Sequence, residues 1–361
     1  MSMFNKNLDH HREDLLPLYT KDGLRHYLQS NHKPPAKLTS VQYLALSELD
    51  RRRYDADRRR HLAGDIIIGT PTVLEARQKI ATMIQNNDRI VGDIRPGCII
   101  SGDGTTGKTT IAKTVMQSVY DDYVGEFPDF EEAGRLPVVF TEVPTSSTGR
   151  VLAAALINSL GGTVHSRETQ PELMTRVFAM LRAFRTELIV VDELHNLNGN
   201  NQGIVDSIST LRQLHNNFPG ILVFAGVKLV ESKLFTGSSG SQLGGRMSLI
   251  EVNKFTLGSK SEAALWKALV RTFENEMPLF AHTPGTLAKH SVDLYEHTGG
   301  SISTLAKIFA SAAKGLIREH NPEMETISLE LLLAQTRDMN SEYRTEIDSA
   351  ENARAKKAAT R

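Results

Sequence analysis

Short apolar runs alternate with amphipathic stretches through the middle of the chain. Five runs of β-branched and aliphatic residues predict strands, at residues 98–101, 138–143, 188–192, 221–225 and 249–252. Their nearly continuous apolarity is typical of strands buried on both faces. Between the runs, apolar residues recur at helical spacing from Ile111 to Val119, from Val151 to Leu160 and from Leu173 to Phe184. Strand alternating with helix predicts a doubly wound parallel α/β sheet.

The two ends of the chain carry different patterns. After Phe255 the apolar spacing is helical only, which predicts a separate small helical unit. Before Ile66 the chain is polar, Pro34 and Pro35 interrupt it, and only residues 41–62 have convincing helical character. The sequence therefore predicts a polar N-terminal extension over residues 1–65, an α/β core over 66–256, a helical domain over 257–340 and a flexible C-terminal tail over 341–361.

Composition excludes several classes of protein. Of 361 residues, 40% are hydrophobic and 23% are charged, which excludes a disordered, collagenous or disulfide-scaffold chain. Lys plus Arg and Asp plus Glu both number 42, so any preference for nucleic acid must come from local patches. One patch is Arg51 to Arg60, where six Arg accompany two Asp, and another is the cationic stretch 354–361. The first is either a salt-bridged solvated helix face or a surface for DNA or a partner.

A single cysteine and short apolar runs bear on the cellular location. Cys98 is the only cysteine, which excludes an intrachain disulfide and a thiolate metal cluster. The longest apolar runs, such as Leu188 to Val191, are far too short to span a bilayer. We therefore expect a cytoplasmic protein with no membrane partner.

A phosphate-binding pattern follows the first predicted strand. Gly102 to Thr109 spells GDGTTGKT before a predicted helix, the context of a P-loop. Its backbone amides and the helix N-terminus would cradle the phosphates of ATP, while Lys108 reaches the β and γ phosphates and Thr109 offers a hydroxyl to Mg²⁺. The expected nucleotide-binding residues are Gly102, Asp103, Gly104, Thr105, Thr106, Gly107, Lys108, Thr109 and Thr110.

An acidic pair lies at the end of the third predicted strand, where residues 188–193 read LIVVDE. We expect Asp192 to serve the metal from the carboxyl end of its strand, where ligands of open α/β sheets bind. Glu193 would act as the general base that orients and deprotonates the attacking water. The pair therefore favours hydrolysis over phosphotransfer. We interpret His195 and Asn196, which follow, as structural caps.

Further segments carry a resemblance to a known family. Residues 138–162 read VVFTEVPTSSTGRVLAAALINSLGG, residues 221–230 read ILVFAGVKLV, and residues 242–255 read QLGGRMSLIEVNKF. Together with the two nucleotide-binding motifs, these segments resemble the AAA+ ATPases and, within them, the TniB and TnsC group of transposition regulators. The resemblance covers roughly residues 66–340. It implies a P-loop AAA+ core with a small C-terminal helical lid domain.

The resemblance also implies a mode of action. ATP-bound protomers would assemble as a ring or helical filament on double-stranded DNA and recruit or activate a DDE transposase, together with a target-selection protein of the TniQ type. Arg246 would be the arginine finger that reaches the neighbouring subunit's nucleotide, with Arg150, Arg212 and Arg271 as rival cations. Two departures from related ATPases predict slow hydrolysis. The fourth strand ends in Gly226 and Val227 instead of a polar residue, and residues 299–309 lack an arginine.

Candidate DNA contacts are cations and hydroxyl groups suited to phosphates. They are Thr145, Ser146 and Arg150 in the Ser/Thr-rich loop, and Lys228 after the fourth strand. Ordinary helix capping is the alternative for the loop. Alternatives also remain for the function: a replication initiator or helicase loader, a P-loop phosphotransferase, or a nucleotide-dependent scaffold or signalling switch without a DNA role.

Overall fold

The computed structural model describes residues 16–30, 35–64, 68–87, 95–197 and 201–335. The chain divides into two compact units. The first contains the residues up to 30, 71–104 and 108–252, and the second contains 31–70, 105–107 and the residues from 253 onward. The predicted flexible tail over 341–361 lies outside the described residues, and the other predicted domain boundaries stay a prediction.

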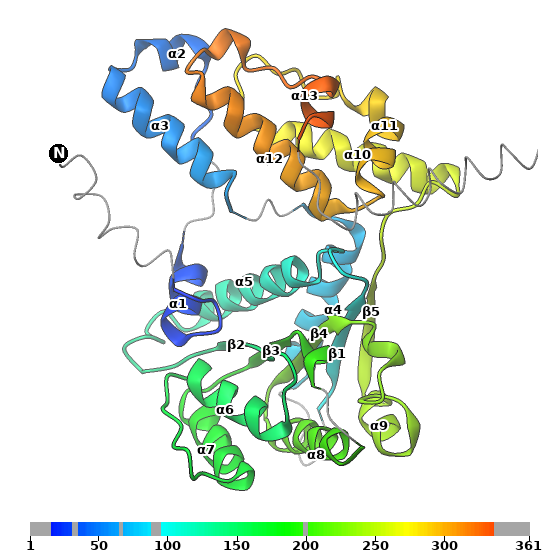
Figure 1. The fold of residues 1–361 in the computed structure, drawn as a ribbon. Coiled ribbons are helices and arrows are strands. Elements are labelled where there is room, and N and C mark those ends of the chain that lie inside the picture. Colours follow the sequence, from blue (N-terminus) through cyan, green and yellow to red (C-terminus); the bar gives the residue numbers. More distant parts are fainter. Residues whose placement is uncertain (1–15, 31–34, 65–67, 88–94, 198–200, 336–361) are drawn as a thin grey trace, which may run out of the picture. The chain divides into compact units, whose positions relative to one another are not determined.

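The first unit is built on a five-stranded parallel sheet (Figure 1). The strands lie in the order β2-β3-β4-β1-β5. Gly97 at the start of β1 aligns with Leu222 of β4 on one side and with Met247 of β5 on the other. This sheet confirms the predicted doubly wound α/β fold, and its strands are β1 (Gly97–Gly102), β2 (Val138–Glu142), β3 (Leu188–Asp192), β4 (Ile221–Val227) and β5 (Met247–Val252).

Helices cover both faces of this sheet, as its apolar strands require. One apolar core joins the sheet to α1 (Lys21–Gln29), α4 (Pro71–Asn87) and α5 (Lys108–Glu126). The other core joins the opposite face to α6 (Gly149–Ser159), α7 (Gln170–Ala183) and α8 (Asn201–Asn217). Successive side chains of a strand point to opposite faces of the sheet. In β1, Cys98 and Ile100 therefore belong to the first core and Ile99 to the second. A further short helix, α9 (Gly237–Gly244), precedes β5.

The second unit is helical. Trp266, Phe273, Ile308 and Phe309 are fully buried in its core, which also takes in Leu62 from the N-terminal part of the chain. Its C-terminal helices are α10 (Lys260–Glu276), α11 (Ser291–Thr298), α12 (Ile302–Arg318) and α13 (Leu329–Leu333). They confirm the predicted helical C-terminal part. Among the described residues of both units, none forms a helix long and apolar enough to cross a membrane.

The predicted helix over residues 41–62 is two helices in the structure. α2 (Ser40–Ala45) begins at Thr39, which forms a capping box with Gln42. The chain turns at Leu46, and α3 (Glu48–His61) starts afresh because the Ser47 side chain accepts a hydrogen bond from the Asp50 amide at 3.2 Å. Serine favours such N-cap positions over helix interiors.

The arginine-rich stretch lies on α3. Several of its arginines are exposed and pair with acids of the same helix, as a salt-bridged face predicts: Arg52 with Glu48, Arg53 with Asp50 and Arg60 with Asp57. Arg58 is instead fully buried. Its guanidinium binds the carboxylates of Asp55 and Glu325, both of which are also buried.

Candidate functional site

The predicted P-loop residues lie where β1 ends and α5 begins. The backbone there turns through left-handed φ angles, +61° at Thr105 and +94° at Gly107, and a turn of this kind directs successive amides to one side. The Lys108 ammonium donates a hydrogen bond to the Asp103 carbonyl. Burial lowers the pKa of the Lys108 amine, although the charges of Asp192 and Glu193 act in the opposite direction. A buried cation among oxygens suits the binding of anionic phosphates.

The two predicted metal ligands are adjacent. The Thr109 hydroxyl donates a hydrogen bond of 2.7 Å to Asp192 Oδ2, so the first turn of α5 meets the carboxyl end of β3. Asp192 is buried, with 1% of its surface exposed. One hydroxyl and one carboxylate fit Mg²⁺, which takes one or two carboxylates and completes its shell with phosphates and water. Among the described residues, no group of three or more His, Cys, Asp or Glu forms a metal cluster.

Glu193 follows β3 directly. Its backbone is left-handed, with φ +56° and ψ +30°, and its amide donates to Asp192 Oδ1 at 2.8 Å. A non-glycine residue in this conformation carries strain of about 1–3 kcal/mol, and such strain gathers at functional sites. The Glu193 side chain is 43% exposed, so a water molecule can reach it.

A third carboxylate at this edge was missed from the sequence. Glu142 ends β2 and aligns with Asp192 of β3. Desolvation, and after it the charges of Asp192 and Glu193, raise the pKa of the Glu142 carboxyl. The signal was present, because Glu142 is the polar last residue of a buried strand.

His195 and Asn196, both predicted to be structural caps, make different kinds of contact. Asn196 is structural, as predicted, since its side-chain amide donates to the Val143 carbonyl at 2.9 Å and its own carbonyl accepts from the Ser147 amide at 3.1 Å. His195 is different. Its Nε2 lies 3.3 Å from Glu193 Oε2, a contact that the predicted capping role did not anticipate.

The predicted DNA contacts lie at the same edge of the sheet as Asp192. Thr145 and Ser146 are exposed in the loop after β2, and Lys228 is exposed after β4. Arg150 is half-buried, and its guanidinium donates to the carbonyls of Glu168 and Ser166 at 3.0 and 3.1 Å. These bonds occupy two of its five N–H donors. Arg150 therefore secures the loop before α7 whatever else it contacts.

Arg246 lies away from the nucleotide-binding residues of its own chain. It precedes β5, is exposed, and accepts a hydrogen bond at its carbonyl from the Gly97 amide at the start of β1. The P-loop follows the other end of β1. Arg246 therefore does not lie beside the P-loop of its own chain, and its role as an arginine finger stays a prediction.

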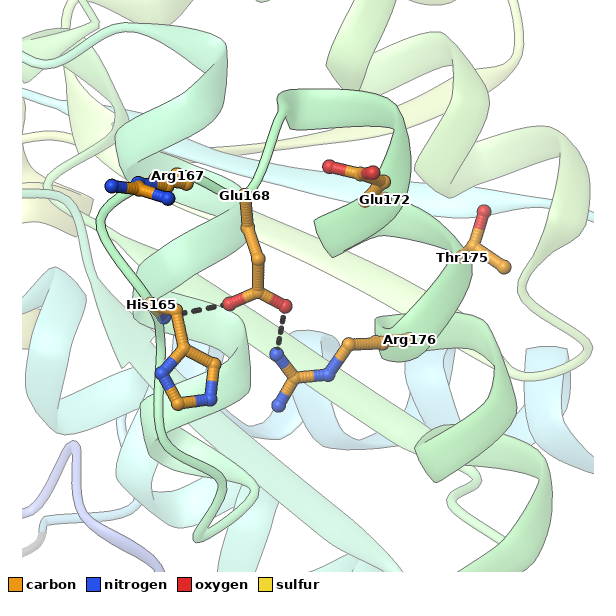
Figure 2. A pocket seen from close by; sticks show the side chains of 6 residues that line it. All are labelled: His165, Arg167, Glu168, Glu172, Thr175 and Arg176. Carbon is orange, nitrogen blue, oxygen red and sulfur yellow. Dashed lines mark hydrogen bonds and ion pairs between the residues drawn. The ribbon is translucent and has the colours of Figure 1, made fainter.

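The loop between α6 and α7 forms an open hollow, shown in Figure 2. Two of its charges pair with each other, because Glu168 binds the Arg176 guanidinium as well as the His165 backbone amide. These contacts lower the pKa of Glu168. The hollow contains none of the predicted site residues, and its lining is His165, Arg167, Glu168, Glu172, Thr175 and Arg176.

Comparisons with known proteins agree with this geometry. The family model described as "Bacterial TniB protein" matches residues 58–257. No curated protein matches the chain. Two solved structures from Aeropyrum pernix have a similar fold. The ORC1 protein in complex with DNA is 16% identical with a TM-score of 0.51, and the match covers 75% of this chain and 65% of that one.

The second structure is the ORC2 protein in ADPNP and ADP complexes, at 13% identity and a TM-score of 0.53, covering 76% of this chain and 70% of that one. At these identities the likeness extends to the fold alone. It confirms the P-loop AAA+ fold predicted from the sequence. The family match confirms the resemblance found in the sequence. This chain, an AAA+ protein with the P-loop of an ATPase, therefore belongs to the TniB family.

Proposed function

We propose that this protein hydrolyses ATP and regulates DNA transposition by assembling on duplex DNA, marking the target site and recruiting or activating a DDE transposase. The observation that carries the proposal is the 2.7 Å contact between Thr109 and Asp192, with Glu193 next along the chain. The family match supports the role in transposition.

Each residue of this edge has a distinct task in the proposal. Lys108 neutralises the β and γ phosphates, and the P-loop amides hold their oxygens. Thr109 and Asp192 would hold Mg²⁺, which when bound would offset the negative charge that develops on the phosphates. Thr110, next on α5, belongs to the same first turn.

Glu193 supplies the base. Its carboxylate accepts a proton from the attacking water and orients that water toward the γ-phosphate. The preceding Asp192 fixes its amide, so the strand that carries the metal ligand also aims the base. Glu142 adds negative charge beside Asp192. We expect this charge to slow turnover because it repels the phosphates of ATP.

Arg246 completes a neighbour's site in the proposal. Its exposed position at the start of β5 lets it meet the nucleotide of another protomer across a head-to-tail interface. There it adds positive charge as the transition state forms. Such an interface generates a ring or a helical filament, depending on whether the rotation closes.

Thr145, Ser146, Arg150 and Lys228 are the proposed contacts to DNA phosphates. Because the chain has no net charge, each protomer contributes few contacts and assembly must add them together. ATP would therefore control DNA binding by controlling assembly. A target-selection protein of the TniQ type and the transposase would recognise the assembled form.

Binding of labelled duplex DNA tests this function. We expect fluorescence anisotropy to show binding with ATP, weak binding without it, and weak binding by Lys108→Ala under both conditions. Lys228→Ala should weaken binding equally for all sequences and reduce the salt slope, whereas Lys267→Ala, an exposed lysine on α10, should not. Adding the purified DDE transposase should then yield strand transfer that requires ATP. Equal DNA affinity with and without ATP would contradict the proposal.

A further inference from the structure

His195 lies between the proposed base and the end of β4. Its Nδ1 accepts a hydrogen bond from the Val227 backbone amide at 3.2 Å. Its Nε2 lies 3.3 Å from Glu193 Oε2. One imidazole ring therefore connects the central strand β4 to the carboxylate that follows β3.

The contact with Val227 fixes which nitrogen carries the proton. A backbone N–H can only donate, so Nδ1 must be the unprotonated nitrogen. The neutral ring then carries its hydrogen on Nε2, the atom that faces Glu193. The Nε2 hydrogen therefore lies on the side of the ring nearest the Glu193 carboxylate, at a distance from which it can restrict that side chain.

The main chain of Glu193 is held at both ends while its side chain is not. The amide donates to Asp192 Oδ1, and the carbonyl accepts from the Asn196 amide at 2.9 Å. Leu194 and Leu197 bury the intervening turn in the core. The Glu193 side chain is 43% exposed, and the His195 ring beside it is placed to restrict its rotamers.

The close approach of the ring depends on Gly226. A methyl group added there would lie 3.2 Å from both the backbone N and Nδ1 of His195, and 3.0 Å from a methyl carbon of Leu229. These distances are shorter than ordinary van der Waals contact. A side chain at 226 would therefore displace the imidazole ring or the turn that carries it.

We propose that His195 is a positioning residue that holds the Glu193 carboxylate toward the attacking water, with its ring seated by Gly226 and Val227. This role rests on the hydrolysis proposed above. In this role Gly226 leaves room for the imidazole ring, and the Val227 amide fixes its orientation. The nearest rival is a purely structural tether between the 194–196 turn and β4.

Two substitutions separate these roles, because each retains one of the two contacts that the imidazole ring makes. In His195→Asn the side-chain oxygen can still accept from Val227 but nothing reaches Glu193. In His195→Gln the amide can extend to the position of Nε2 and donate to Glu193. We expect His195→Asn to lower kcat about 10- to 100-fold with KM and Tm unchanged, and His195→Gln to recover part of that loss. Full activity of His195→Asn would overturn the proposal in favour of the tether.

A double-mutant cycle tests the role of Gly226. Gly226→Ala should lower kcat in the wild type but cost little further in His195→Asn, because its effect acts through the ring. Equal costs in both backgrounds would overturn the proposal. His165→Asn, an exposed histidine before α7, is the matched control and should retain the wild-type rate.

The outcome also distinguishes the positioning role from the proposed function. If the wild type fails to hydrolyse ATP, or Glu193→Gln hydrolyses it normally, the proposed function fails and the positioning role fails with it. If the wild type is active, Glu193→Gln is inactive and His195→Asn equals the wild type, only the positioning role fails. Two-bond ¹⁵N–¹H NMR spectra of the full chain should show the Nε2–H tautomer of His195, and an Nδ1–H tautomer would contradict the geometry.

Discussion

Replacing Arg58 by methionine should strongly destabilise the second unit. The Arg58 guanidinium lies 2.5 Å from Asp55 Oδ1, 2.6 and 2.9 Å from the two oxygens of Glu325, and 2.9 Å from the Pro278 carbonyl. It also lies over the rings of Tyr43, Tyr54 and Phe280. Methionine fills a similar volume but removes the guanidinium from two buried carboxylates. Asp55 then keeps its contacts with His320 Nδ1 at 2.7 Å and the Tyr43 hydroxyl at 2.8 Å, while Glu325 keeps the Phe280 amide at 3.1 Å.

The expected magnitude follows from those contacts. Four bonds from the charged guanidinium, at about 1.5–3 kcal/mol each, set an upper bound, but burying the charges offsets much of that gain. Breaking a buried ion pair by removing one partner costs about 3–5 kcal/mol. We expect a loss of that size in the free energy of unfolding. The exposed pair of Arg52 with Glu48 should contribute only about 0.3–0.5 kcal/mol, so Arg52→Met is the matched control.

Guanidinium chloride titration followed by tryptophan fluorescence measures this effect. Trp266 is the only tryptophan and is buried in the core of the same unit as Arg58, so its emission reports on that unit. The triple variant Arg58→Met, Asp55→Asn, Glu325→Gln should regain part of the lost stability, because it leaves no unpaired charge. An Arg58→Met protein within about 1 kcal/mol of Arg52→Met, or a triple variant less stable than the single one, would refute the reasoning.

Two further predictions concern assembly and pH. Arg246→Ala and Glu193→Gln should each be inactive alone. Mixing them should restore part of the ATPase activity, because one complete site forms where the two variants meet. If the variants co-assemble and the mixture stays inactive, the arginine finger would be assigned to Arg212 or Arg271 instead. Burial, and then the charge of Arg246, lower the pKa of His215, so the unfolded chain binds more protons and stability should fall as the pH drops below about 6.5. Urea titrations followed by circular dichroism between pH 5 and 8 give the free energy of unfolding at each pH. This free energy should depend less on pH in His215→Leu than in the wild type, and an unchanged pH dependence would contradict this cause.

Strands and motifs were predictable because their signals are local. β1 to β4 are buried along almost their whole length and are therefore apolar, so their runs were visible in the sequence. For β5 the predicted burial of both faces is wrong, because Ile250 and Val252 are buried while Leu249 is 37% exposed. The P-loop and the acidic end of β3 combine residue type with position, which is why Thr109 and Asp192 could be paired before the structure. The break between α2 and α3 was missed, although Ser47 carries an N-cap signal.

Contacts that depend on packing were not predictable. Glu142 reaches Asp192 because β2 and β3 pair in one particular register, and His195 meets Val227 because β4 lies beside β3. Nothing in the composition of α3 distinguishes Arg58 from its exposed neighbours. Helical spacing offers a partial signal, since Asp55, Arg58 and Leu62 share a face and all three are buried.

The edge formed by Thr109, Asp192 and Glu193 is proposed to bind ATP and hydrolyse it. The most direct test measures nucleotide affinity by calorimetry and turnover by phosphate release on the same preparation of Glu193→Gln. We expect wild-type affinity, since Lys108, Thr109 and Asp192 remain, with turnover reduced by at least about 100-fold. A Glu193→Gln protein that hydrolyses ATP at the wild-type rate would contradict the assignment of the base.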